Sequence, residues 1–99
     1  MLEPLDRARA LAALRFRALG DETRLRLLEL LADGEQTVAG LMELTGLGQS
    51  LVSHHLRTLR EAGLVQPRRE GKWVHYSIAG AALNAVRLTI YELEPLKVV

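Results

Sequence analysis

The spacing of apolar residues divides the chain into four helical segments, a β-hairpin and a last helix. Apolar side chains recur three and four positions apart over 5–19, 22–32, 37–45 and 49–61, as on one face of an α-helix. From about residue 64 to 78 the period changes to alternation, and over 79–93 the helical spacing returns. This order predicts a single, mainly helical (α+β) domain.

The two short helices at about 37–62 are joined by a link of only three residues. Thr37 offers a hydroxyl as the N-terminal cap of the first helix, and Gly46 can take the positive φ that a sharp reversal needs. Leu47 supplies an apolar plug beneath the turn, and Gly63 follows the second helix as a left-handed cap. We therefore predict a helix-turn-helix unit.

The second helix of this unit has two chemically different faces. Val52, Leu56 and Leu59 have the spacing of a stripe that points into a core. The opposite side is short-chained and uncharged until its last member, and consists of Gln49, Ser50, Ser53, His54 and Arg57. Gln, Ser and Arg pair with base edges in the major groove, so we expect these residues to contact bases or nearby phosphates. The alternative is a solvated helix in a small helical domain that never touches DNA.

The alternating segment at about 64–78 predicts a two-stranded hairpin. Glu70-Gly71 fits a two-residue turn, and Pro67 indicates an edge strand. The inward face is expected to hold Val74, Tyr76 and Ile78, and the basic residues near the tip are Arg68, Arg69 and Lys72. A basic hairpin after a recognition helix is the layout of a winged helix-turn-helix, whose wing reaches the DNA backbone or minor groove. The alternative for the charges is a merely soluble loop.

The other helices are expected to form the core and a dimer interface. Asp21 can cap the helix at 22–32, whose leucines (Leu25, Leu27, Leu28, Leu30 and Leu31) make it the predicted centre of the core. The helices at about 5–19 and 79–93 carry more apolar surface than one small core can bury. We expect them to join two copies of the chain through Leu5, Leu11, Leu14, Leu83, Val86, Ile90 and Leu93. The alternative is that these faces only cover the core.

Charge is distributed unevenly, although a net charge of +1 alone would not indicate a polyanionic partner. Residues 1–48 hold six basic and eight acidic residues, whereas 49–99 hold seven basic and four acidic ones. The positive field therefore lies with the predicted recognition helix and wing. The chain has no cysteine, no apolar run of the roughly 20 residues that span a membrane and no secretory pattern at its start, so we expect a soluble, cytoplasmic protein.

Three strings of the sequence, LGDETRLRLLELLADGE, GQSLVSHHLRTLREAGLV and RREGKWVHYSI, resemble the ArsR/SmtB family of winged-helix repressors. The resemblance covers about Ala12 to Ile78. It implies an α-helical homodimer with a β-wing that binds an imperfect palindrome in double-stranded DNA over a promoter and releases it when an effector binds. The sequence does not indicate which effector that is.

The metal sites of the family do not carry over. Where many members have a Cys-x-Cys pair, this chain has Thr37 and Ala39, and residues 79–99 contain neither His nor Asp. His54 and His55 are adjacent in a helix and diverge too far to chelate one ion. We expect no metal, no cofactor and no catalysis, because no nucleophile elbow or phosphate loop is present. Two alternatives remain: a winged-helix module that binds another protein, and a metal sensor with an atypical His/carboxylate site.

Overall fold

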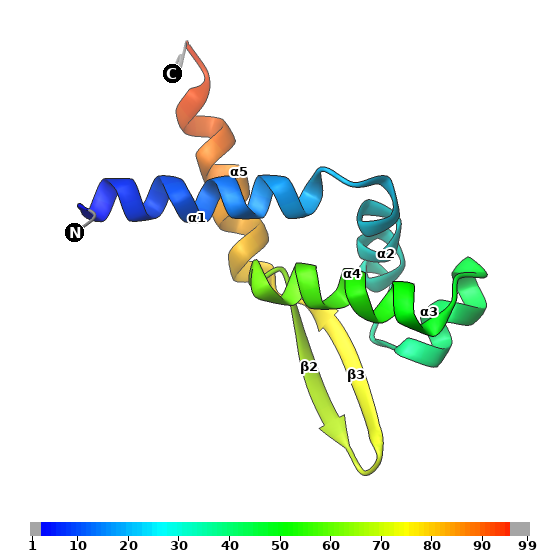
Figure 1. The fold of residues 1–99 in the computed structure, drawn as a ribbon. Coiled ribbons are helices and arrows are strands. Elements are labelled where there is room, and N and C mark those ends of the chain that lie inside the picture. The colour runs from blue at the N-terminus through cyan, green and yellow to red at the C-terminus, as the bar shows by residue number, and fades with distance from the viewer. Residues whose placement is uncertain (1–2, 96–99) are drawn as a thin grey trace.

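The computed structural model describes residues 3–95 of the chain. Within them, several helix ends are fixed by capping side chains or by glycines. Asp21 and Thr37 each accept a hydrogen bond from the backbone N–H three residues later, at 3.0 and 3.1 Å. Gly46 and Gly63 have φ angles of 75° and 74°, so all four predicted caps are confirmed. The elements are α1 (Pro4–Leu19), α2 (Glu22–Ala32), β1 (Gln36–Thr37), α3 (Val38–Thr45), α4 (Gln49–Glu61), β2 (Val65–Glu70), β3 (Trp73–Ile78) and α5 (Gly80–Leu93) (Figure 1).

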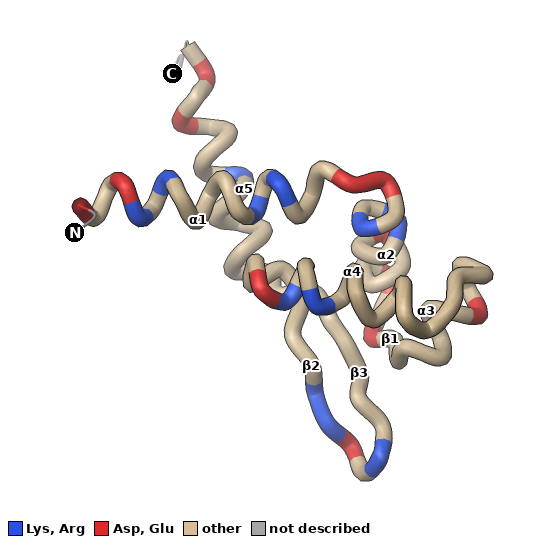
Figure 2. The backbone as a smooth tube through the Cα atoms, in the orientation of Figure 1, with Lys and Arg blue, Asp and Glu red and all other residues tan. Residues whose placement is uncertain are grey.

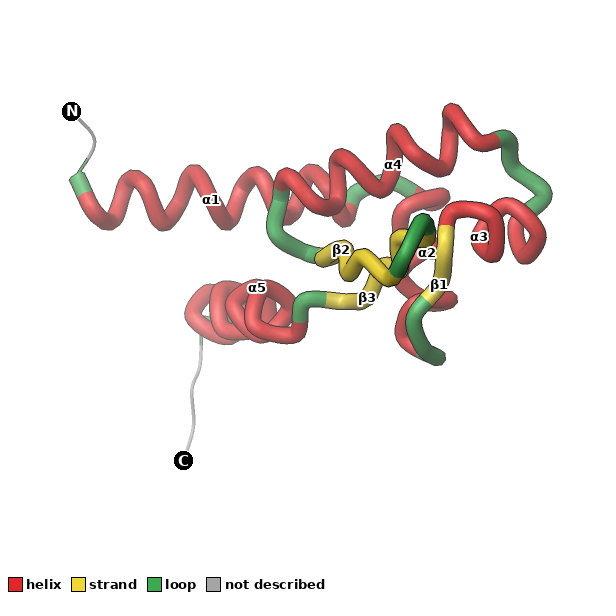
Figure 3. Tube along the Cα trace, turned by 90° about the horizontal axis from the view of Figure 1, so that it is seen from below, coloured by secondary structure: helices red, strands yellow, loops and turns green. Residues whose placement is uncertain are grey.

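The hairpin projects from the helical body as a wing, and α4 lies beside its base (Figure 1). Viewed from below, α1 and α4 lie on one side of the strands and α5 on the other (Figure 3). The predicted winged helix-turn-helix is therefore confirmed, with α3 and α4 as its two helices. The arrangement places the exposed side of α4 and the wing in one connected surface.

The wing sheet differs from the prediction in two details. It has three antiparallel strands in the order β1-β3-β2, because Gln36 and Thr37 pair with β3. A two-residue strand has no alternating pattern to reveal it. The turn also lies one residue later than predicted, since Glu70 pairs with Trp73 and leaves Gly71 and Lys72 between the strands. Gly71 has a φ of 60° and Lys72 does not have a positive φ, as in a type II′ turn. β2 is an edge strand, as its proline indicates.

Many of the buried core residues lie on α2 and on the buried stripe of α4. Leu27, Leu28 and Leu31 of α2 are buried, which confirms this helix as a centre of the core. Leu25 was expected among them but is 47% exposed, because it lies off the stripe that the other leucines form. It lines an apolar hollow with Ile78 and Leu83.

The two terminal helices leave apolar side chains uncovered. α1 crosses α5 and its first turns extend past the crossing (Figure 1). Five of the seven residues predicted to form a dimer interface are exposed: Leu5, Leu11, Leu14, Ile90 and Leu93. Val86 instead is buried and Leu83 packs partly against the core, because the first half of α5 covers the chain's own core. Within residues 3–95, no helix is long and apolar enough to cross a bilayer.

We expect Gly46→Ala to lower the free energy of unfolding by about 1–2 kcal/mol, because an L side chain is strained in the left-handed region. The strain is conformational, since nothing lies within 4 Å of an added Cβ. Gly80→Ala is the matched control: its Cβ also meets open space, and its φ is not positive. Urea unfolding of both variants measures the difference, and equal losses would show that the left-handed backbone of Gly46 is not the cause.

Candidate nucleic-acid interface

α4 turns a polar surface to solvent above a fully buried stripe. Val52, Leu56 and Leu59 are at most 1% exposed, which confirms the core face predicted from their spacing. On the other side Ser53 is partly buried, and the remaining predicted contact residues, Gln49, Ser50, His54 and Arg57, are exposed. No side chain caps the N-terminus of α4, so the N–H groups of its first turn are available to an acceptor such as phosphate.

His55 anchors this helix to α2. It is 8% exposed, and its Nδ1 lies 3.2 Å from Nη1 of Arg24. Arg24 also donates to the carbonyl of Ala18, at the end of α1. Burial is the main cause that lowers the pKa of His55, while the Asp21 carboxylate, 3.9 Å away, opposes the shift. The ring is therefore held neutral and accepts the Arg24 hydrogen bond, which fixes how α4 sits on the body of the domain.

The depressed pKa of His55 predicts a loss of stability in mild acid. The unfolded chain takes up the proton more readily than the folded one, so this contribution is complete above about pH 6.5 and is lost as pH falls towards the folded-state pKa. We expect the free energy of unfolding to fall as the pH is lowered below about 6.5, the ordinary pKa of histidine, and to fall less in His55→Gln. His54→Gln is the matched control, because the His54 ring is exposed. The same pH dependence in both variants would contradict this role of His55.

The two adjacent arginines of the wing lie on opposite faces of β2 and have different surroundings. Arg68 donates through Nε and Nη2 to both oxygens of Glu35, at 3.1 and 2.8 Å, and through Nη1 to Glu70 at 3.1 Å. These hydrogen bonds raise the pKa of Arg68 above its usual value. The hydrogen bond that Glu35 accepts from Arg68 in turn lowers the pKa of the Glu35 carboxyl group. Arg69 is exposed and has no such partner among residues 3–95. Lys72 occupies the tip, with its Nζ 5.4 Å from the Trp73 ring centroid.

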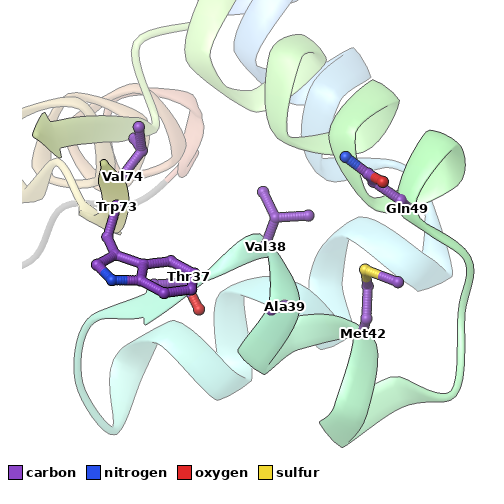
Figure 4. A pocket seen from close by; sticks show the side chains of 7 residues that line it. All are labelled: Thr37, Val38, Ala39, Met42, Gln49, Trp73 and Val74. Atoms are coloured by element: carbon purple, nitrogen blue, oxygen red, sulfur yellow. The ribbon is translucent and has the colours of Figure 1, made fainter. Parts of the chain in front are cut away.

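Two hollows lie between the helix-turn-helix unit and the wing, and Val74 lines both of them. The first, of about 320 Å³, is walled by Thr37, Val38, Ala39, Met42, Gln49, Trp73 and Val74 (Figure 4). The second, also of about 320 Å³, is lined by Arg60, Pro67, Arg69, Val74 and Tyr76. We call these two hollows together the helix–wing trough. Along the backbone, Lys and Arg positions fall in the last turns of α4 and in the wing (Figure 2).

Arg60 was not among the residues predicted to contact DNA, although its spacing could have revealed it. It follows Ser53 by seven positions and Gln49 by eleven, so the three share one side of α4. The predicted polar face ended at Arg57, whereas the exposed side of α4 continues to Arg60. The structure therefore brings Gln49 and Arg60 to the two ends of the trough, and Arg69 to its wing side.

The positions that hold cysteines in metal-sensing members do not fit a metal here. The Thr37 hydroxyl is occupied as the cap of α3, and Ala39 has no donor atom. Across residues 3–95, no group of three or more His, Asp or Glu side chains is close enough to hold an ion. The nearest His–carboxylate pair of the wing is His75 Nε2 and Glu70 Oε1, 3.9 Å apart.

Comparison with known proteins agrees with this architecture. The family described as "Bacterial regulatory protein, arsR family" matches residues 21–66, from the cap of α2 into β2. The solved homodimeric winged helix-turn-helix DNA-binding domain of a possible ArsR-family transcriptional regulator from Mycobacterium bovis superposes with a TM-score of 0.78. It is 31% identical, and the match covers 93% of this chain and 87% of that one. The chain belongs to the arsR family. That family is one of bacterial regulatory proteins, and its solved member from Mycobacterium bovis is a winged helix-turn-helix DNA-binding domain.

Relatives of this arsR-family chain include both a repressor and an activator of transcription. It is 48% identical over 63 residues to a probable mercury resistance operon repressor of Streptomyces lividans. That match covers 64% of the chain and 50% of the relative. It is 33% identical over 92 residues to the transcriptional activator HlyU of Vibrio cholerae, covering 93% of the chain and 85% of the relative. The chain thus spans only half the length of the first of these relatives.

Proposed function

We propose that this arsR-family protein is a homodimeric repressor that recognises a two-fold symmetric operator in double-stranded DNA. The observation that carries the proposal is the exposed side of α4, which combines polar side chains suited to base edges with an uncapped N-terminus. Gln49, Ser50, Ser53 and His54 contact bases or nearby phosphates, and Arg57 binds the backbone or a guanine. Lys72 and Arg69 hold the wing against the backbone.

The proposed dimer is supported by the uncovered apolar side chains of α1 and α5. Leu5 and Leu93 are 78% and 74% exposed, and Leu11, Leu14 and Ile90 are also open to water. Burying such side chains against a second copy is favourable, at about 25 cal/mol per Å² of apolar surface. A two-fold axis between the copies would set two α4 helices about one DNA turn, roughly 34 Å, apart. Each operator half-site would then be read by one α4.

Repression follows from occupancy, because a dimer covering the promoter excludes RNA polymerase. Release requires an effector that favours a conformation with lower affinity for DNA. We propose that a metal is not sensed through positions 37 and 39, because threonine and alanine there cannot ligate a soft ion. As a regulator of transcription, the protein would act in the cytoplasm.

The repressor proposal is tested with the natural promoter that carries the bound sequence, placed before a reporter gene. Expression of the protein should lower reporter output several-fold, and scrambling one half-site should restore it. A rise in output would identify an activator instead. No change with an intact site would show that binding at that promoter does not regulate it.

A further inference from the structure

Two arginines without a carboxylate partner line the same hollow of the helix–wing trough. Arg60 comes from the last turn of α4 and Arg69 from β2, and Pro67, Val74 and Tyr76 complete the lining. Among residues 3–95, neither arginine makes a hydrogen bond or ion pair to another side chain, and no carboxylate lines the hollow. The site is therefore an uncompensated cluster of donors in a concave surface.

The chemistry of the cluster fits a phosphate diester. Each guanidinium offers a planar fork of N–H donors that matches two phosphate oxygens, and the phenol adds an O–H donor. The neighbouring Arg68 is different, because Glu35 and Glu70 already occupy its guanidinium on the opposite face of β2. Only the trough side of the strand therefore presents free positive charge in this part of the wing.

The location of the hollow indicates which phosphate it would bind. Arg60 shares the side of α4 that carries Gln49 and Ser53, and the wing closes the other wall of the trough. When a helix fills the major groove and a wing approaches the adjacent minor groove, the backbone strand between the two grooves passes through the space that separates them.

We propose that Arg60, Arg69 and Tyr76 form a binding site for one backbone phosphate of the operator in each half-site. The proposal rests on the function proposed above, in which α4 enters the major groove. In the proposed phosphate site, Arg68 is a positioning residue. It ties the wing to Glu35, in the segment before β1, and does not itself contact DNA. The site fixes the register of α4 on the duplex and carries no sequence information.

The test uses operator duplexes in which one phosphate at a time is replaced by an uncharged methylphosphonate. For the wild-type protein, neutralising the bound phosphate should lower affinity about tenfold. For the double variant Arg60→Gln/Arg69→Gln, affinity for the unmodified operator should already be about 100-fold lower, because the dimer loses the site in both half-sites, and the same methylphosphonate should cause no further loss. The slope of log affinity against log salt counts the phosphates that the protein neutralises. In the double variant this slope should become shallower by the equivalent of about one phosphate per half-site and not two, because both arginines share one phosphate.

Arg68→Gln is the matched control, because it removes the same charge from the adjacent position on the other face of β2. It should remain as sensitive as the wild type to the same methylphosphonate. Tyr76→Phe should lose part of the affinity without changing unfolding, since the ring that packs on the core is kept.

A double variant that keeps the wild-type sensitivity at every methylphosphonate position would overturn the phosphate site. So would a double variant that loses its preference for the operator over unrelated DNA, since the arginines would then be reading bases. Failure of the wild-type protein to select any operator is a distinguishable result: it would overturn the proposed function and this site with it.

Discussion

Ile90→Glu should convert the protein from a dimer to a monomer and lower its affinity for the operator by at least about 100-fold. Ile90 is 49% exposed on α5, beside the still more exposed Leu93, and a carboxylate buried there against a second copy would be uncompensated. A monomer keeps one recognition helix, whereas the advantage of a specific site over non-specific DNA, about 10³ or more, is shared between two half-sites. The chain should still fold, because Ile90 lies outside the buried core.

Leu88→Glu is the matched control for this substitution. Leu88 lies on the same helix and is 55% exposed, but two positions along α5 place it on the opposite side. Analytical ultracentrifugation should find a dimer for Leu88→Glu and a monomer for Ile90→Glu. Dimers in both cases, with full operator binding, would show that the Ile90 face of α5 does not join the two copies.

Ser53→Ala and His54→Ala should each lower affinity for the operator by about 10- to 100-fold while leaving affinity for a scrambled duplex nearly unchanged. A side chain that pairs with a base edge contributes about 1–3 kcal/mol of discrimination, and a dimer uses each side chain twice. Lys72→Ala should behave differently, because a phosphate contact at the wing tip strengthens binding to every sequence.

Titrations on both duplexes distinguish these roles. Equal losses on operator and scrambled DNA for Ser53→Ala and His54→Ala would remove these residues from base recognition. The His54 ring centroid lies 5.4 Å from that of His55, so the unfolding of His54→Ala is measured alongside as a control for displacement of the anchor.

The parts of the fold that were predictable from the sequence are those set by neighbours along the chain. Asp21 and Thr37 cap helices through N–H groups three residues away, and Gly46 and Gly63 end helices through their own φ angles. The stripe on α4 follows from helical spacing alone. β1 was missed because its two residues are strand only by pairing with β3, about 40 positions later.

Charge pairing was the main feature of the site that the sequence did not reveal. Arg68 and Arg69 were grouped as wing-tip cations, yet Glu35, 33 positions before Arg68, engages the first of them. Strand alternation separates the two arginines onto opposite faces, but only the folded chain shows which face meets a carboxylate. The anchor between Arg24 and His55 is equally non-local, because the two residues are 31 positions apart.

The most direct test of specific recognition by α4 is selection of bound duplexes from a random DNA pool by the purified protein at about 0.15 M salt, where loose phosphate binding is weakened. We expect a two-fold symmetric motif whose half-sites are centred about one turn apart, and a change of that motif when the selection is repeated with Ser53→Ala. Recovery of no motif, or of an identical motif with the variant, would contradict the assignment of base recognition to this face of α4.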